Sequence, residues 1–281
     1  MDAYEMYLEI REQIGETTEA HWTDAGILRK LNMNYKALWG QLAMQAGDWL
    51  GASVSVTASA SVITLPSDCG KPLYLEDSNG YQIPILGTVR EKRLTDPVGA
   101  KLEEPGLIAY PLGNTLVINK SGDASTYTLW YVKRYQNMHF GVAGASSGAA
   151  ALHLESTNAP SMTNDYYNGL GVNWYVGSTG AIVAEDTITD YVGATMVATV
   201  SGTPTATTHS YGTVSELPEE GDLYLIQRTV AGCLAKPSAA IDPKYYQFAL
   251  DRMKEAKADW VEWISSRVPG GGHVRRTGGD I

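Results

Sequence analysis

The side chains that most often catalyse reactions or bind metals are thinly spread along this sequence. Its five histidines show neither HExxH nor CxxC types of spacing, which would bring metal ligands together. His153 and Glu155 share one face of a strand, because alternate residues of a strand point the same way, but no third ligand accompanies them. Cys69 and Cys233 are too few for a metal cluster or a disulfide framework. We therefore expect no metal site, and two buried free thiols in a reducing compartment.

The patterns of nucleophilic catalysis and nucleotide binding are also missing. The sequence contains no GxSxG elbow and no GxxxxGK[ST] or GxGxxG loop, and its glycine-rich end follows a helix rather than a strand. The adjacent acids Glu103-Glu104 and Glu219-Glu220 each lie beside a proline and a glycine, which is typical of exposed turns. A glycosidase needs two carboxyl groups held about 5–10 Å apart across a cleft, and nothing marks such a pair here. We predict that the protein is not an enzyme and binds no cofactor.

Helical periodicity occurs at both ends of the chain. Apolar residues recur at spacings of three and four in four segments: residues 2–14, 24–49, 222–237 and 242–266. Thr23 suits the N-cap of the second segment, and Asp242 followed by Pro243 is typical of a helix start. Each segment has one apolar face, and short helices gain most of their stability from packing, so we expect the four helices to pack together.

The middle of the chain has the alternating pattern of β-strands. Valine and alanine alternate with serine and threonine over residues 52–65. Asn79-Gly80 predicts a hairpin, and residues 125–135 are rich in β-branched and aromatic side chains. After a small-residue linker at 141–150, short apolar runs separated by glycines predict a small sandwich or barrel-like module.

These patterns together predict an α+β fold. Its helices form a discontinuous four-helix bundle from the N- and C-terminal ends, with a β-rich insertion of two small β modules and an extended C-terminal tail. In this division the helical domain comprises residues 1–51 and 222–266. Between its two segments lie a β domain at 52–140 and the second β module at 141–221, and the tail follows at 267–281.

Charge and aromatic residues point to assembly more than to chemistry. The chain has 21 basic and 31 acidic residues, and a net charge of −10 argues against wrapping of DNA. No apolar run approaches the roughly 20 residues of a membrane span, so we expect no membrane contact.

Basic residues gather in the tail at Arg267, His273, Arg275 and Arg276. They predict a docking peptide that becomes ordered when it binds a partner, and the alternative is a solvated tail.

Two groups of aromatic residues have alternative interpretations. One group lies on the helical stripes and predicts helix packing or contacts between subunits: Trp22, Tyr35, Trp39, Trp260 and Trp263. The other group lies in the glycine-rich β module, where it predicts either a core and interface or a sugar-binding platform: Tyr166, Tyr167, Trp174 and Tyr175.

The segment from Trp22-Thr23-Asp24 through Leu31-Asn32 to Tyr35 resembles the N-terminal helices of the head-to-tail adaptor (connector) proteins of tailed bacteriophages. The strand that ends in LPSD at 65–68, followed by LYLEDSNGYQIPI, is similar to the β part of those adaptors. A further stretch, residues 165–200, resembles a small β module of phage virion proteins.

The resemblance implies a non-enzymatic ring of twelve copies beneath the portal protein, at the head–tail junction of the virion, with the free protein in the host cytoplasm before assembly. The helices would pack side by side around the ring and the basic tail would run onto portal subunits. The ring would extend the DNA channel without sequence-specific binding and would contact a tail, nozzle or next neck protein. The alternative is a carbohydrate-binding or adhesin-type β-rich protein of a virion or cell surface, based on Trp174 and Tyr175.

Overall fold

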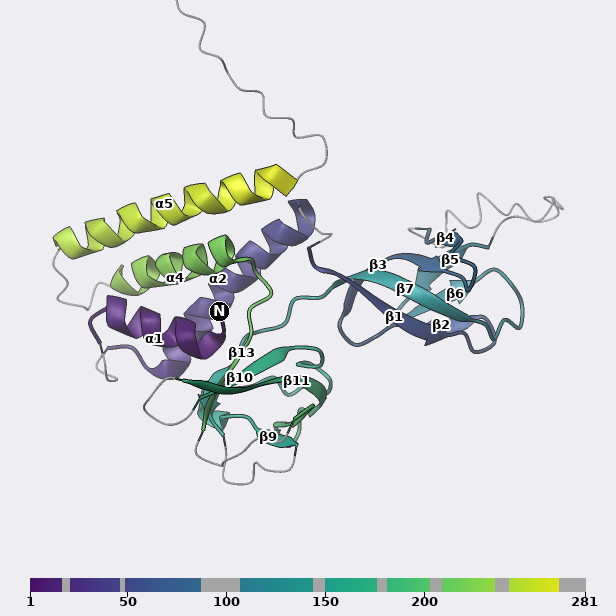
Figure 1. Ribbon diagram of the computed structural model, residues 1–281, viewed down its shortest axis with the longest axis horizontal. Coiled ribbons are helices and arrows are strands. Elements are labelled where there is room, and N and C mark those ends of the chain that lie inside the picture. Colours follow the sequence, from purple (N-terminus) through teal and green to yellow (C-terminus); the bar gives the residue numbers. More distant parts are fainter. Residues whose placement is uncertain are drawn as a thin grey trace, which may run out of the picture. The chain divides into compact units, whose positions relative to one another are not determined.

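The computed structural model describes residues 1–16, 21–45, 49–86, 107–143, 150–175, 181–202, 209–235 and 243–267. The chain divides into two compact units, one of residues 1–46 with 136–281 and the other of residues 47–135. Within the described residues, four α-helices accompany 13 strands in three antiparallel sheets (Figure 1). None of the described helices has the length and apolar character needed to cross a membrane.

The larger unit brings helices from both ends of the chain together. They are α1 (Ala3–Gln13), α2 (Asp24–Gln45), α4 (Glu219–Leu234) and α5 (Pro243–Arg267). α4 packs against α5 and α2, and α1 also contacts α4. The predicted apolar stripes are buried in part: the core includes Ile27, Leu31, Leu38 and Leu42 of α2 and Ile226 and Val230 of α4, whereas Leu223 of α4 and Phe248 of α5, which lie on the same stripes, are exposed.

The same unit contains a six-stranded antiparallel sheet with the order β8-β13-β10-β11-β12-β9. Its strands are β8 (Phe140–Val142), β9 (Ala151–His153), β10 (Gly171–Tyr175), β11 (Ile182–Val192), β12 (Val197–Val200) and β13 (Ser210–Thr213). A 3₁₀ turn, η1 (Ser156–Asn158), follows β9. The sheet encloses its own core of apolar and aromatic side chains, and α1 contacts β13 and β8.

The predicted fold class is wrong. The protein is a β-rich α+β structure with 13 strands among its described residues, not a four-helix bundle with small β modules. The error arises because helical stripes are long and easy to recognise, whereas three-residue strands such as β8 and β9 leave little periodicity. Residues 141–221, expected as a separate insertion, belong to the same compact unit as the helices.

The smaller unit consists of two antiparallel sheets. The first sheet has the strand order β1-β7-β3-β4 and consists of β1 (Gly51–Thr57), β3 (Cys69–Glu76), β4 (Gln82–Pro84) and β7 (Thr126–Lys133). The second sheet has the strand order β2-β6-β5 and consists of β2 (Val62–Thr64), β5 (Ala109–Leu112) and β6 (Thr115–Ile118). The hairpin predicted at Asn79-Gly80 is confirmed, since β3 pairs with β4 and Gly80 has φ +83°. Cys69, expected to be buried, is half-buried, whereas Cys233 is fully buried.

Helix boundaries differ from the sequence-based ones for local reasons. Glu219 and Glu220, expected in an exposed turn, form the first turn of α4, where carboxylates favour the positive end of the helix dipole. The N-cap predicted at Thr23 is confirmed, because its hydroxyl accepts a hydrogen bond from the Gly26 amide at 3.1 Å. Glu103, Glu104 and Asp242 lie outside the described residues.

The first residue of the chain is tied to α4. The Met1 ammonium donates to Oδ2 of Asp222 at 2.9 Å, and the Asp222 side chain is buried. Burial raises the pKa of Asp222 to about 6, although the neighbouring ammonium favours its charged form.

We expect Asp222 to make the folded state less stable as the pH rises from about 4 to about 6. The folded chain holds this proton more tightly than the unfolded chain, so the contribution is fully present below the unfolded pKa and is lost as the pH rises through the folded pKa. At roughly 1.4 kcal/mol per pKa unit, the free energy of unfolding should fall by about 3 kcal/mol over this pH range. Urea titrations at pH 4 and pH 6.5 should show a flatter pH dependence for Asp222→Asn than for the unmodified chain. Equal slopes for the two proteins would contradict this assignment.

Candidate functional site

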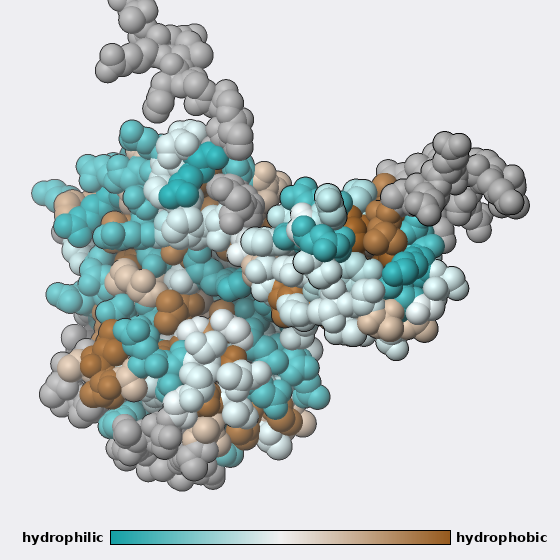
Figure 2. Space-filling view, turned by 45° about the vertical axis from the view of Figure 1, so that its right-hand side comes forward, coloured by the Kyte–Doolittle hydropathy of each residue, from teal (hydrophilic) through white to brown (hydrophobic). Residues whose placement is uncertain are grey.

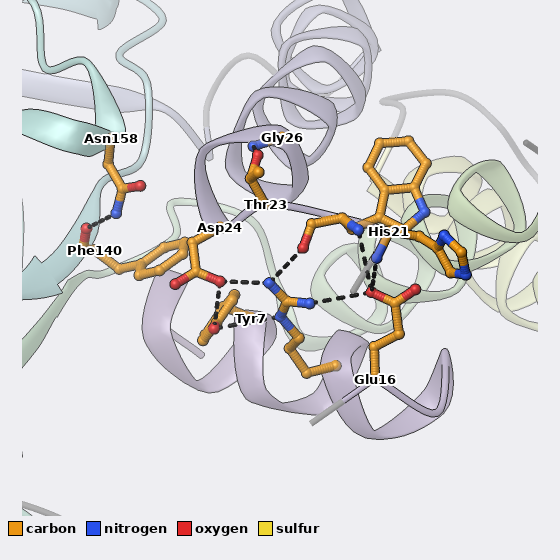
Figure 3. A network of polar contacts seen from close by, with 10 residues as sticks. Tyr7, Glu16, His21, Thr23, Asp24, Gly26, Phe140 and Asn158 are labelled. Atoms are coloured by element: carbon orange, nitrogen blue, oxygen red, sulfur yellow. Dashed lines mark hydrogen bonds and ion pairs between the residues drawn. The ribbon is translucent and has the colours of Figure 1, made fainter. Parts of the chain in front are cut away.

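Two of the residues that carry the phage resemblance, Trp22 and Asp24, belong to a clasp between α1 and α2 that has Arg11 at its centre (Figure 3). The Arg11 Nη2 group donates to Oδ1 of Asp24 at 2.5 Å and to the carbonyl oxygen of Trp22 at 2.7 Å. Its Nη1 group donates to Oε2 of Glu16 at 3.3 Å. The Tyr7 hydroxyl donates to the same Asp24 oxygen at 2.6 Å. We call these five residues the Arg11 clasp.

The centre of the clasp is shielded from water, although the Asp24 side chain is 39% exposed. The Arg11 side chain is only 5% exposed. Burial lowers the pKa of Arg11, but the hydrogen bonds to Asp24 and Tyr7 outweigh that effect and raise it. Burial and the hydrogen bond to Asp24 together raise the pKa of Tyr7 to about 12. At neutral pH the guanidinium is therefore charged and the phenol is neutral, which lets both groups donate to the Asp24 carboxylate.

A cavity of about 500 Å³ adjoins the clasp. Its walls come from the start of α1, the start of α2, β8, η1 and β13: they are lined by Tyr4, Tyr7, Thr23, Asp24, Ala25, Phe140, Gly141, Val142, Glu155, Thr157, Asn158 and Ser210. The volume is in the range of ordinary ligand pockets. We call it the acidic cavity, because Asp24 and Glu155 are the charged residues among those described as lining it.

One wall of the acidic cavity is aromatic. Phe140 of β8 stacks on Tyr7 with ring centroids 4.3 Å apart, and Tyr4 lies 6.3 Å from Phe140. Asn158 holds β8 in place by donating to the carbonyl oxygen of Phe140 at 2.7 Å (Figure 3). The cavity thus combines π faces with carboxylates, the two features that attract a cationic group.

Glu155 is held in a fixed position within the cavity. Its Oε1 atom accepts hydrogen bonds from the amide and the hydroxyl of Thr157, at 3.4 and 3.0 Å. Its own amide donates to the hydroxyl of Tyr211, which in turn contacts Nδ1 of His139 at 2.9 Å. Burial lowers the pKa of His139 to about 3, so this histidine is neutral and does not offset the carboxylate charge.

The aromatic residues predicted for helix packing or a ring interface have different environments. Tyr35 and Trp260 are buried: the Tyr35 hydroxyl accepts from the Glu216 amide at 3.1 Å, and the Trp260 indole donates to Gln41 at 3.1 Å. Trp22, Trp39 and Trp263 are half-buried.

The first residue of the predicted docking tail packs on α5. The guanidinium of Arg267 lies 5.0 Å from the ring centre of Trp263, which stacks on Trp260 at 5.8 Å. His273, Arg275 and Arg276 lie outside the described residues, so their docking role stays a prediction.

The residues considered for sugar binding are mostly inside the protein. Trp174 and Tyr175 are each 1% exposed, and Tyr167 is equally buried. Trp174 donates its indole hydrogen to Asp186 at 2.9 Å, and the Tyr175 hydroxyl bonds to Asp2. They form core contacts, so they offer no exposed platform for a sugar ring.

Sequence reasoning misses Arg11 and Phe140, and it singles out Glu155 for a different role. Arg11 follows Tyr7 by one helical turn on α1, a spacing that indicates contact between the two side chains but not their shared partner Asp24. The strand alternation pairs Glu155 with His153 as possible metal ligands. No group of three potential metal-binding side chains occurs in the part of the chain that the structure describes.

Comparisons with known proteins do not assign this chain to a family. No protein-family model matches it, and no curated protein matches its sequence at a significant level. Its function therefore has to be inferred from the Arg11 clasp, the acidic cavity and the helical surface.

Proposed function

We propose that this protein is a structural head-to-tail adaptor of a tailed bacteriophage. In this role it forms a ring beneath the portal protein, extends the DNA channel and links the capsid to the tail, a nozzle or the next neck protein. The main observation in support is the Arg11 clasp. Trp22 and Asp24, which carry part of the resemblance to adaptors, join α1 to α2 through Arg11, and Thr23 caps the start of α2.

The position of the tail also supports the proposal. α5 ends at Arg267, and the other basic residues predicted to dock lie at positions 273–276 of the tail that follows. Because Arg267 packs on Trp263 at the end of α5, the tail begins from a defined point on the helical unit. A segment of this kind can bind a partner outside its own copy while the helices stay packed.

The helical surface offers apolar groups for contact with neighbouring copies. Phe248 and Val261 of α5 are 54% and 52% exposed, and Leu223 of α4 is also exposed. Leu223 lines a hollow of about 250 Å³ between α4 and α5, whose other described lining residues are largely polar. On the face that Figure 2 shows, apolar side chains form small patches among polar ones.

Deletion of residues 268–281 is expected to reduce attachment to purified portal rings at least tenfold. The described helices end at Arg267, so the midpoint of urea unfolding should not change. Native mass spectrometry of the protein mixed with portal would measure attachment and copy number. Portal must be present, because a template can be needed before copies associate.

A matched variant separates charge from chain length in this experiment. The full-length chain with Arg275→Ala and Arg276→Ala keeps the tail but removes its two adjacent guanidinium groups. We expect it to lose most of the attachment that the deletion loses. Normal attachment by the deletion variant, or a monomer in the presence of portal, would count against the adaptor function.

A further inference from the structure

The acidic cavity has an excess of negative charge. Arg11 is the cation at its edge, and Asp24 and Glu16 both pair with it. Among the described lining residues, Asp24 and Glu155 are charged and both are carboxylates, and Asp24 is the one that pairs with Arg11. Tyr4, Tyr7 and Phe140 contribute aromatic surface beside them. A cavity with this lining favours a guanidinium or ammonium group over a neutral or anionic ligand.

The chain itself contains a segment that fits this chemistry. Arg275 and Arg276 are adjacent, and glycines precede and follow them in the tail sequence VPGGGHVRRTGGDI. A guanidinium group from this segment would offset the negative charge of the cavity. A planar guanidinium can bond to a carboxylate in a bidentate manner and stack on an aromatic ring, which an ammonium does less well.

The geometry of the helices disfavours contact between the cavity and the tail of the same copy. α2 and α5 run in the same general direction, because Tyr245 near the start of α5 bonds to Gln13 and Trp260 bonds to Gln41 of α2. At 1.5 Å per residue, the end of α5 lies roughly 35 Å from Asp24 at the start of α2. The backbone from Arg267 to Arg276, fully extended, spans about 30 Å, so even with the length of an arginine side chain the tail would reach its own cavity only by running straight back along the helices.

We propose that the Arg275–Arg276 segment of one copy binds the acidic cavity of a second copy, so that its contribution to portal attachment comes through closure of the ring and not through direct contact with the portal. In this contact Glu155 pairs with one guanidinium, and the rings of Tyr4 and Tyr7 pack against the arginine side chains. The contact joins two different surfaces, so it repeats from copy to copy and closes a ring if the rotation between copies allows. The ring-closing role rests on the proposed adaptor function, whereas binding of the segment to the cavity does not.

The test uses a labelled synthetic peptide of residues 268–281 and, as its receptor, the full-length chain with Arg275→Ala and Arg276→Ala. The substitutions remove competition from the receptor's own tails. Fluorescence anisotropy should show saturable binding that weakens as salt is raised, because charge attraction drives it. A peptide with both arginines replaced by alanine should bind at least tenfold more weakly.

Receptor variants locate the binding site. Glu155→Gln keeps the size of the side chain and an oxygen acceptor for Thr157, and it should weaken binding of the peptide at least tenfold. Glu255→Gln, on the exposed surface of α5, is the matched control and should leave the affinity unchanged. Unfolding midpoints of both variants should equal that of the parent, so that a loss of binding reflects the cavity.

Three results would overturn the proposal: equal binding of the arginine and alanine peptides, no effect of Glu155→Gln, or an equal effect of Glu255→Gln. Binding of the peptide to purified portal and not to the receptor would also overturn it, while leaving the adaptor function intact. Conversely, the peptide could bind at the cavity while the full-length protein neither forms a ring nor attaches to portal. That result would support the contact between copies and reject the adaptor function.

Discussion

Replacement of Asp2 with alanine is expected to lower the free energy of unfolding by about 4 kcal/mol, the largest effect of a single substitution predicted for this chain. The Asp2 side chain is fully buried. Its Oδ1 atom accepts from the amides of Tyr4 and Glu5 at 2.8 and 3.1 Å, which caps α1. Its Oδ2 atom accepts from Asn173 at 2.9 Å and from the Tyr175 hydroxyl.

The size of the effect follows from the donors left behind. Alanine would leave two helix N–H groups, one amide and one phenol without their acceptor in a buried site, and each unmet buried donor costs about 1–3 kcal/mol before relaxation and water entry reduce the sum. No other side chain links α1 to β10 through so many of the described hydrogen bonds. Loss of the interaction should therefore loosen the helices from the six-stranded sheet.

Two control variants test this account of Asp2. Asp2→Asn keeps one carboxamide oxygen for the helix cap and should lose roughly half as much stability as Asp2→Ala. Tyr175→Phe removes a single hydrogen bond and should lose about 1–2 kcal/mol. Urea unfolding followed by tryptophan fluorescence and by circular dichroism measures all three. A loss below about 1 kcal/mol for Asp2→Ala would show that the buried carboxylate does not hold α1 on the sheet.

Replacement of Arg11 with alanine is expected to lower the free energy of unfolding by about 3–4 kcal/mol. The substitution leaves the Asp24 and Glu16 carboxylates without their cation and the Trp22 carbonyl without its donor. Arg11→Lys keeps a charge but cannot bond to three acceptors in the planar geometry of a guanidinium, so it should recover less than half of the loss.

A double-mutant cycle isolates the central contact of the clasp. Asp24→Asn and Arg11→Ala each remove the pair, so the double variant should be more stable than the sum of the two losses predicts, by about 1–3 kcal/mol. The measurement is urea unfolding at neutral pH and at two salt concentrations. Additive losses would mean that Arg11 and Asp24 stabilise the chain through separate contacts. Salt should weaken the coupling only in part, because the guanidinium is shielded from water whereas the Asp24 side chain is 39% exposed.

The helical part of the site could be predicted from the sequence to a large extent. Thr23 is recognisable as a cap because its hydroxyl bonds to an amide three residues away, and such local contacts depend on neighbouring residues alone. The same holds for the start of α5 at Pro243 and for the hairpin at Asn79-Gly80. The acidic cavity could not be predicted, because Tyr7, Asp24 and Glu155 come from three separate segments of the sequence.

The β-rich part shows where local patterns stop being informative. The buried positions of Val172 and Trp174 follow from alternation along β10, but the neighbours of β10 do not. β10 lies between β11 and β13. The edge strand β8 pairs with β13, although β9 to β12 lie between these two strands in the sequence. Short strands pair according to how their side chains pack, and several strand orders in a sheet are compatible with the same alternation of apolar and polar residues.

The sequence by itself determined the helices, their apolar faces, the tight turns and the basic tail, since each depends on residues within a few positions of one another. Only the tertiary structure decided that β8 to β13 form one sheet in the same unit as the helices, and that Asp2 meets Asn173 and Tyr175. The physical reason is that these contacts join segments about 170 residues apart. Their energy comes from burial and hydrogen bonding in the folded chain, which no local periodicity records.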